Sequence, residues 1–179
     1  MVDERDDETL VRAFQNGQPM ALATLYRRHR SRLFRLALVW LEDAELAEDA
    51  VQCVFERGVR GLPRFRFNAS PFTWLYRTLR NVCHEIRRKQ AVVAEPVDIV
   101  DAAPTLELQH ARLQTAQRVR TLVQRLPPRQ REVVMLRIFE ELSVADTAAS
   151  MGCRQGTVKA LLHKAKAALL RQWQDENDD

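Results

Sequence analysis

Residues 143–166 read SVADTAASMGCRQGTVKALLHKAK, and this stretch decides the fold of the C-terminal part of the chain. Ser143, followed three residues later by Asp146, fits a capping box at the start of a helix. Gly152 stands where a tight turn needs a residue that tolerates positive φ. A second helix is expected from about Gln155, with apolar side chains on one side and cations on the other. Two short helices around a glycine turn predict a helix-turn-helix.

The outer side of the second helix is polar and cationic. Such a helix can enter the major groove of DNA while its lysines and arginines meet phosphates. An ordinary helical hairpin with a solvated basic face is the alternative interpretation. The candidate DNA-binding residues of this recognition helix are Arg154, Gln155, Thr157, Lys159, His163, Lys164 and Lys166.

Residues 8–89 also carry helical periodicity. The acids Glu42 and Asp43 are suited to a helix N-terminus, and the helix that follows is expected to end near Gly58. After a break, Ser70–Pro71 forms an N-cap and N1 pair for a helix running to about Lys89.

Residues 90–105 contain two prolines and no helical spacing, which favours an extended linker. Helical periodicity resumes from Thr105, and Pro127–Pro128 ends one helix and begins the next. The sequence therefore predicts an all-α protein with two small helical domains joined by an extended linker. The expected boundaries are 8–89, 90–107 and 108–172, the last domain containing the helix-turn-helix.

Charge is distributed in blocks along the chain. Residues 9–89 hold 15 basic and 7 acidic groups, a net +8, and residues 108–174 hold 12 and 4, again +8. The stretch 90–107 between them carries −4. Two basic modules suit a partner that is a polyanion, because each can neutralise phosphates separately. A solvated surface on two helical domains explains the same counts equally well.

Several classes of protein are disfavoured by what the sequence lacks. Its three cysteines and four histidines are scattered, so neither a disulfide framework nor a metal site is expected, and no cofactor motif is present. The acidic N-terminus is unlike a signal peptide, and no apolar run is long enough for a membrane span. A cytoplasmic protein without membrane insertion is expected.

Two stretches resemble the sigma factors of bacterial RNA polymerase. Residues 126–137, LPPRQREVVMLR, with the Glu-Leu-Ser and GTVKALLHKA segments after them, resemble region four. Residues 45–55, ELAEDAVQCVF, and the segment from Phe65 to Arg88 resemble region two. With these two regions and a short linker, the chain is similar to the extracytoplasmic-function group. The resemblance covers residues 8–89 and 108–172.

The resemblance implies that the acidic helix of region two docks on the clamp helices of core RNA polymerase. Glu48 and Asp49 would make its charged contacts, with Gln52 one turn along. Pairing with the dipole of a first helical turn is the alternative, but both acids lie inside the predicted helix.

The resemblance further implies that the segment from Arg64 to Arg88 melts the minus-ten element and holds the non-template strand, while the helix-turn-helix binds the minus-thirty-five duplex. Cations for phosphates, with aromatic rings or pockets for unstacked bases, favour single strands over duplex. Phe65 and Phe72 are expected in the core, and Trp74 is expected to pack there too. The candidate residues for the minus-ten element are Arg64, Arg66, Asn68, Trp74, Arg77, Arg80, Asn81, His84, Arg87 and Arg88.

Three positions depart from the family pattern. Arg154 stands where a serine commonly caps the recognition helix, Glu85 stands where aspartate is common, and Gly58 stands where bulky residues are common.

In the family the linker threads through the polymerase, and a plain flexible tether is the alternative. An anti-sigma partner is a family expectation.

The predicted function is therefore a sigma factor that directs core RNA polymerase to promoters, of a stress or envelope regulon, and promotes strand opening. A stand-alone helix-turn-helix regulator is the alternative, although it leaves the acidic helix and the basic aromatic segment unexplained. An enzyme is disfavoured, because the sequence shows no phosphate loop, metal spacing or carboxylate pair with a histidine.

Overall fold

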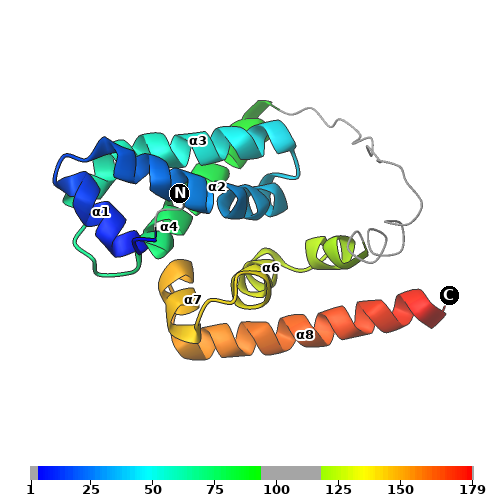
Figure 1. Cartoon of the computed structure of the whole chain (residues 1–179). Coiled ribbons are helices and arrows are strands. Elements are labelled where there is room, and N and C mark those ends of the chain that lie inside the picture. Colours follow the sequence, from blue (N-terminus) through cyan, green and yellow to red (C-terminus); the bar gives the residue numbers. More distant parts are fainter. Residues whose placement is uncertain (1–3, 94–117, 179) are drawn as a thin grey trace, which may run out of the picture. The chain divides into compact units, whose positions relative to one another are not determined.

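The computed structural model describes residues 4–93 and 118–178. These residues form helices and connecting turns, with no strand in either range. They fall into two compact units, one ending at Val93 and one made by the described residues after it (Figure 1). The predicted all-α fold class with two helical domains is confirmed.

The first unit is a bundle of helices around a leucine-rich core. The elements are α1 (Asp7–Gln15), α2 (Pro19–Leu41), α3 (Ala44–Gly61), the short 3-10 helix η1 (Leu62–Arg64) and α4 (Pro71–Val93). The helices α2 and α3 lie side by side, and α4 packs against both (Figure 1). Leu10, Leu25, Leu33, Leu36, Leu75 and Leu79 are fully buried between them.

The turn between α2 and α3 was predicted correctly, but the end of α3 was not. Asp43 Oδ1 accepts a hydrogen bond from Leu46 N at 2.9 Å and caps α3. The expected end near Gly58 is wrong, because the helix continues to Gly61 and Gly58 is buried within it. Pro63 has no N–H with which to continue the α-helical hydrogen bonds, and the chain passes into the 3-10 helix η1.

The N-terminus of α4 follows the prediction, and its C-terminus does not. Ser70 Oγ accepts from Thr73 N at 3.1 Å, and the helix begins at Pro71. Residues 90–93, expected in the linker, continue α4 to Val93, because no proline occurs before Pro96. The rest of the expected linker lies outside the described residues.

The second unit places the helix-turn-helix on two supporting helices. Its elements are a helical segment that ends at residue 124, α6 (Pro128–Val134), the π-helical turn η2 (Met135–Phe139), α7 (Val144–Met151) and α8 (Gln155–Asp178). The break at Pro127–Pro128 is confirmed, whereas α8 runs past the expected boundary at residue 172. Arg129 Nη1 donates to Glu132 Oε2 at 3.1 Å and to Met151 O at 3.2 Å, which ties α6 to the end of α7.

The turn η2 was not predicted from the sequence. Glu140 N donates to Met135 O at 3.0 Å, a bond that spans five residues instead of four. The extra residue shifts the side chains that follow, so Leu136 is buried while Ile138 and Phe139 are 45% and 50% exposed. The apolar side chain of Ile138 therefore reaches the surface.

Candidate polymerase- and DNA-binding surfaces

The three candidate polymerase contacts lie on the exposed side of α3. Glu48 and Asp49 come after the first turn of the helix, as expected, so the dipole of that turn does not account for them. Glu48 also forms an ion pair with Arg30 of α2, at 3.2 Å. Gln52 Nε2 donates to Glu56 Oε1 at 2.9 Å, which extends the polar row by one more turn.

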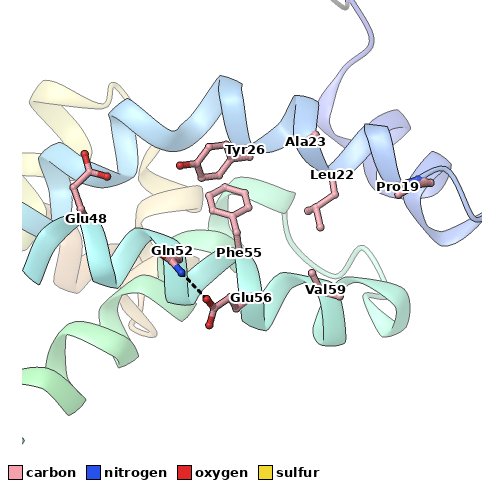
Figure 2. Close-up of a pocket in the computed structure, with 9 residues that line it drawn as sticks. All are labelled: Pro19, Leu22, Ala23, Tyr26, Glu48, Gln52, Phe55, Glu56 and Val59. Atoms are coloured by element: carbon pink, nitrogen blue, oxygen red, sulfur yellow. Dashed lines mark hydrogen bonds between the residues drawn. The ribbon is translucent and has the colours of Figure 1, made fainter.

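This polar row borders a groove of about 600 Å³ between α2 and α3 (Figure 2). The rings of Tyr26 and Phe55, which both line the groove, are in edge-to-face contact. Their centroids are 4.8 Å apart and their planes meet at an angle of 81°. An apolar floor with carboxylates along one side can hold a partner that is apolar and basic. The residues that line the groove are Pro19, Leu22, Ala23, Tyr26, Glu48, Gln52, Phe55, Glu56 and Val59.

Sequence reasoning found two of these nine positions, Glu48 and Gln52. The position of Val59 could have indicated the groove. Val59 follows the buried Phe55 by one helical turn, yet it is 54% exposed. An apolar residue that continues a buried stripe into solvent marks a place where another surface can pack.

The connection between α3 and α4 presents three of the candidate minus-ten residues. Arg64, Arg66 and Asn68 are exposed, whereas Phe65 and Phe67 between them are half-buried. The backbone here is not a regular strand, because Arg64 belongs to η1 and Phe67 has a left-handed φ of 57°. The connection nevertheless exposes all three polar side chains.

The remaining candidates of the segment lie on α4. The helical spacing puts Trp74, Arg77, Asn81, His84 and Arg88 in one row, because steps of three and four residues return to the same face. Arg80 and Arg87 flank that row. Arg77, Asn81, His84, Arg87 and Arg88 are exposed, and Arg80 is half-buried. The ring of His84 lies against Trp40 of α2, with centroids 5.3 Å apart.

The aromatic side chains differ from one another in burial. Phe72 is 4% exposed and belongs to the core, as predicted. Phe65 was also expected in the core, but it is half-buried. Trp74 packs against Gly61, where a Cβ would lie 2.6 Å from Trp74 Cζ2, and its ring centroid is 6.5 Å from that of Phe65. Trp74 is half-buried, so part of its surface remains accessible.

Glu85 connects α4 to α3. Arg57 of α3 donates two hydrogen bonds to the Glu85 carboxylate, at 3.1 and 2.6 Å. Hydrogen bonding to Arg57 lowers the pKa of Glu85, and its bond to Glu85 raises the pKa of the guanidinium. The one acid amid the cations of this helix is thereby neutralised by α3.

The helix-turn-helix forms at the expected residues. Ser143 Oγ accepts from Asp146 N at 3.0 Å and caps α7. Gly152 has φ 61°, and the next backbone N–H, that of Cys153, donates to Ala148 O. Thr157 N and Val158 N both donate to Arg154 O, so Arg154 occupies the cap position of α8. Its guanidinium has no acceptor atom and cannot cap the helix with its side chain.

The candidate residues on α8 do not all lie together. Val158 and Ala165 are fully buried and mark the inner side. Arg154, Gln155, Thr157 and Lys159 are exposed within the first turns, the part of a recognition helix that contacts base edges. His163, Lys164 and Lys166 are exposed farther along. At 1.5 Å per residue, Lys166 lies about 16 Å beyond Gln155.

Lys166 also borders an apolar groove of about 350 Å³ in the second unit. Phe139, Leu170 and Trp173 are 50%, 59% and 38% exposed there. Sequence reasoning missed this groove, because the π-helical turn η2 helps to form it. The residues that line it are Val119, Leu122, Val123, Val134, Ile138, Phe139, Lys166, Leu169, Leu170 and Trp173. Clustered apolar exposure of this kind is typical of a protein–protein contact.

The described residues offer little to a metal ion or a membrane. The side chains of His, Cys, Asp and Glu in residues 4–93 and 118–178 form no group of three that could hold a metal ion. Cys53, Cys83 and Cys153 are free thiols, and burial raises the pKa of Cys83 to about 12. In the same ranges, no helix has both the length and the apolar character of a membrane span.

Both units match known sequence families. Residues 25–92 match the family Sigma-70 region 2, and residues 116–169 match Sigma-70, region 4. The two regions occur in the order that the residue patterns predicted.

Similar proteins extend these matches over almost the whole chain. The ECF RNA polymerase sigma factor SigM of Mycobacterium tuberculosis is 36% identical over 169 residues, which cover 94% of this chain and 85% of SigM. The RNA polymerase sigma-H factor of Pseudomonas aeruginosa is 29% identical over 182 residues, 94% of each chain. The solved structure of CnrH, in complex with the cytosolic domain of CnrY, has the same fold, with a TM-score of 0.74 at 23% identity over 94% of this chain and 97% of that one. Since a relative this similar spans most of both sequences, the chain belongs to the family of ECF RNA polymerase sigma factors.

Proposed function

We propose that this sigma factor docks on core RNA polymerase through the α2–α3 groove and the acidic row beside it, and opens the minus-ten element with α4 and the connection before it. One observation carries the proposal: adjacent helices of one small unit expose a carboxylate-lined groove and a row of cations. The bond between Arg57 and Glu85 joins these two helices. Docking and strand binding therefore belong to one structural unit.

Strand opening requires a surface that prefers a single strand to duplex. Arg64 and Arg66 can neutralise phosphates, and Asn68 can hydrogen-bond to a base edge that is exposed only after melting. The accessible part of Trp74 offers a ring on which an unstacked base can lie. Because these contacts form only with the open strand, their binding free energy shifts the equilibrium from duplex DNA toward open DNA.

The second unit is proposed to hold the minus-thirty-five duplex. The first turns of α8 would enter the major groove, with Gln155 and Thr157 facing base edges and Arg154 and Lys159 facing phosphates. Sigma factors are transcription initiation factors, and no catalytic step is assigned to this chain. A stand-alone regulator is not favoured, since the first unit matches sigma-70 region 2.

Regulation by a protein partner is part of the proposal. RpoE of Bartonella quintana was solved in complex with the anti-sigma factor NepR, and it shares this fold with a TM-score of 0.65 at 24% identity. For this chain we expect an anti-sigma factor, action in the cytoplasm with RNA polymerase, and promoters of a stress or envelope regulon.

The test is run-off transcription with purified core RNA polymerase and a promoter library. Transcription from selected promoters is expected with this chain and is expected to be lost with Glu48→Lys/Asp49→Lys, because charge reversal in an interface costs several kcal/mol, about a hundredfold or more in affinity for core. The control Glu4→Lys/Glu8→Lys makes the same change of charge at two exposed residues elsewhere in the unit. Tight duplex binding by the chain alone, with no transcription, would contradict the proposal.

A further inference from the structure

The N-terminal helix α1 makes a specific contact with the connection between α3 and α4 (Figure 1). Gln15, the last residue of α1, donates both N–H groups of its side-chain amide to this connection. One reaches Leu62 O at 2.9 Å and the other reaches Phe65 O at 3.0 Å. The two carbonyls belong to the ends of one tight turn, because Phe65 N itself donates to Leu62 O at 3.1 Å. A single amide group therefore fixes where this turn lies.

A second residue of α1 holds the next part of the connection. Arg12 precedes Gln15 by one helical turn, and its guanidinium carbon lies 4.0 Å above the centroid of the Phe67 ring. Phe67 has φ 57°, a left-handed conformation that a bulky residue adopts only when its surroundings impose it. Its ring also contacts that of Phe65, with centroids 4.9 Å apart. The cation and the aromatic pair are the visible cause of this strained backbone.

These contacts determine the direction of the exposed side chains. The rings of Phe65 and Phe67 are held by these contacts and are half-buried, while Arg64, Arg66 and Asn68 between and beside them are exposed. We propose that Gln15 and Arg12 are positioning residues for minus-ten recognition, although both lie outside the segment that would touch DNA. This inference rests on the proposed role of that segment in binding the open strand.

A positioning role has a physical requirement that the contacts meet. A side chain that reads a base edge must be held to within about 0.5 Å of its productive place. The residues between η1 and α4 form no helix or strand. Their backbone is therefore not fixed by a regular series of backbone hydrogen bonds, and side-chain contacts have to fix it instead. Gln15 and Arg12 supply two hydrogen bonds and one ring contact to three residues of this connection, Leu62, Phe65 and Phe67.

The test compares Gln15→Met and Arg12→Met with a matched control in full-length chain bound to core polymerase. Methionine keeps the length of the Gln15 side chain and the aliphatic part of the Arg12 side chain, and it removes the N–H donors of both. The control is Gln18→Met, because Gln18 is exposed and its side chain receives one long hydrogen bond, from Arg5 Nη1 at 3.5 Å. The probe is a single-stranded DNA library randomised over the minus-ten positions, and the readout is the ratio of affinities for selected and unselected strands.

We expect both variants to lower this ratio about tenfold, the effect of losing one well-placed base contact. Affinity for core polymerase should stay within about twofold of the parent chain, as for Gln18→Met. Hydrogen exchange should accelerate at the Phe65 amide while that in the middle of α2 is unchanged, which separates local release from unfolding. A ratio unchanged in both variants, whether or not exchange accelerates, overturns the inference.

A further variant separates this inference from the proposed function. Arg87→Ala/Arg88→Ala removes two exposed cations of α4 that α1 does not hold. If strand binding falls in this variant but the ratio is unchanged in Gln15→Met and Arg12→Met, the positioning role fails and the proposed function stands. If strand binding is unchanged in the α4 variant as well, the proposed function of the segment fails.

Discussion

Asp7 is the residue through which α1 is fastened to the rest of the first unit. It is the first residue of α1, and its carboxylate contacts His29 Nε2 at 2.6 Å and Arg28 Nη1 at 2.7 Å. His29 is 5% exposed, and its ring also lies against Phe72 of α4. Burial alone would raise the pKa of Asp7, but the hydrogen bonds and charges of His29 and Arg28 outweigh it, so the pKa is lowered.

We expect Asp7→Asn to destabilise the protein near neutral pH by about 1–3 kcal/mol, the range for hydrogen bonds to a charged group. Because the folded-state pKa of Asp7 is lowered, its contribution is present above the unfolded pKa, near 3.8, and is lost as pH falls through the folded pKa. The difference between parent and variant should therefore shrink below about pH 4. Urea unfolding at a series of pH values measures it, and a difference that stays constant down to pH 2 would contradict this assignment.

Gly61 is small because Trp74 occupies the space beside it. A Cβ at this position would lie 2.6 Å from Trp74 Cζ2, so Gly61→Ala must displace the indole. We expect a loss of about 1–3 kcal/mol in the free energy of unfolding, as for other overpacked sites. The control is Gly156→Ala in α8, where no atom lies within 4 Å of the added Cβ. That variant should gain about 0.5–1 kcal/mol from helix propensity. Equal effects of the two changes on stability would show that the contact with Trp74 is unimportant.

At the level of elements, the start of α8 is a residue whose side chain cannot cap the helix and is proposed to contact DNA. Arg154 occupies the cap position with a side chain that cannot accept a hydrogen bond. We expect Arg154→Ser to stabilise the second unit by about 0.5–1 kcal/mol, because serine can accept from the free N–H groups of the first turn. The same change removes a cation near DNA, so the salt dependence of duplex binding should fall by about one phosphate contact.

Calorimetry and binding titrations on the same protein measure these two effects. If the variant has a higher free energy of unfolding but the same salt dependence of duplex binding, then Arg154 does not contact the phosphates. A variant that lost stability would show that the arginine stabilises the turn in some other way.

The helix starts were predictable because their causes are local. Asp43, Ser70 and Ser143 each accept a hydrogen bond from a backbone N–H three residues ahead, and a short sequence window contains both partners. The helix ends were predicted less well: Gly58 lies inside α3, and the last residues of α4 extend to Val93. A glycine did not end α3, which continues until two residues before Pro63, and a weak periodicity did not end α4 at Lys89.

Features made by contacts between distant residues could not be predicted. Gln15 is separated by 47 and 50 residues from the carbonyls that it binds, and Val59 lines its groove together with residues of α2 far away in the sequence. The π-helical turn η2 depends on packing that a helical pattern does not encode. The exposed cations of α4 and α8 were found from the sequence, whereas the grooves beside α3 and α8 required the structure.

For the whole molecule, the two basic stretches imply two separable electrostatic contributions to promoter binding. Residues 9–89 and 108–174 each carry a net charge of +8. If the first binds an open strand and the second binds duplex, their cations should respond to salt with different slopes. The logarithm of the binding constant falls with the logarithm of salt concentration by about 0.9 per phosphate contact on duplex and about 0.7 on single strands.

Two pairs of exposed cations test this division in the complex with core polymerase. Lys159→Ala/Lys164→Ala in α8 should lower the slope for an upstream duplex by about 1.8, and leave the slope for a single-stranded minus-ten oligonucleotide unchanged. Arg87→Ala/Arg88→Ala in α4 should lower the single-strand slope by about 1.4, and leave the duplex slope unchanged. Each pair is exposed and carries the same charge, so the two variants serve as controls for each other. If either pair changed both slopes equally, the cations would act as one diffuse field over the whole chain, and the assignment of one unit to each promoter element would be wrong.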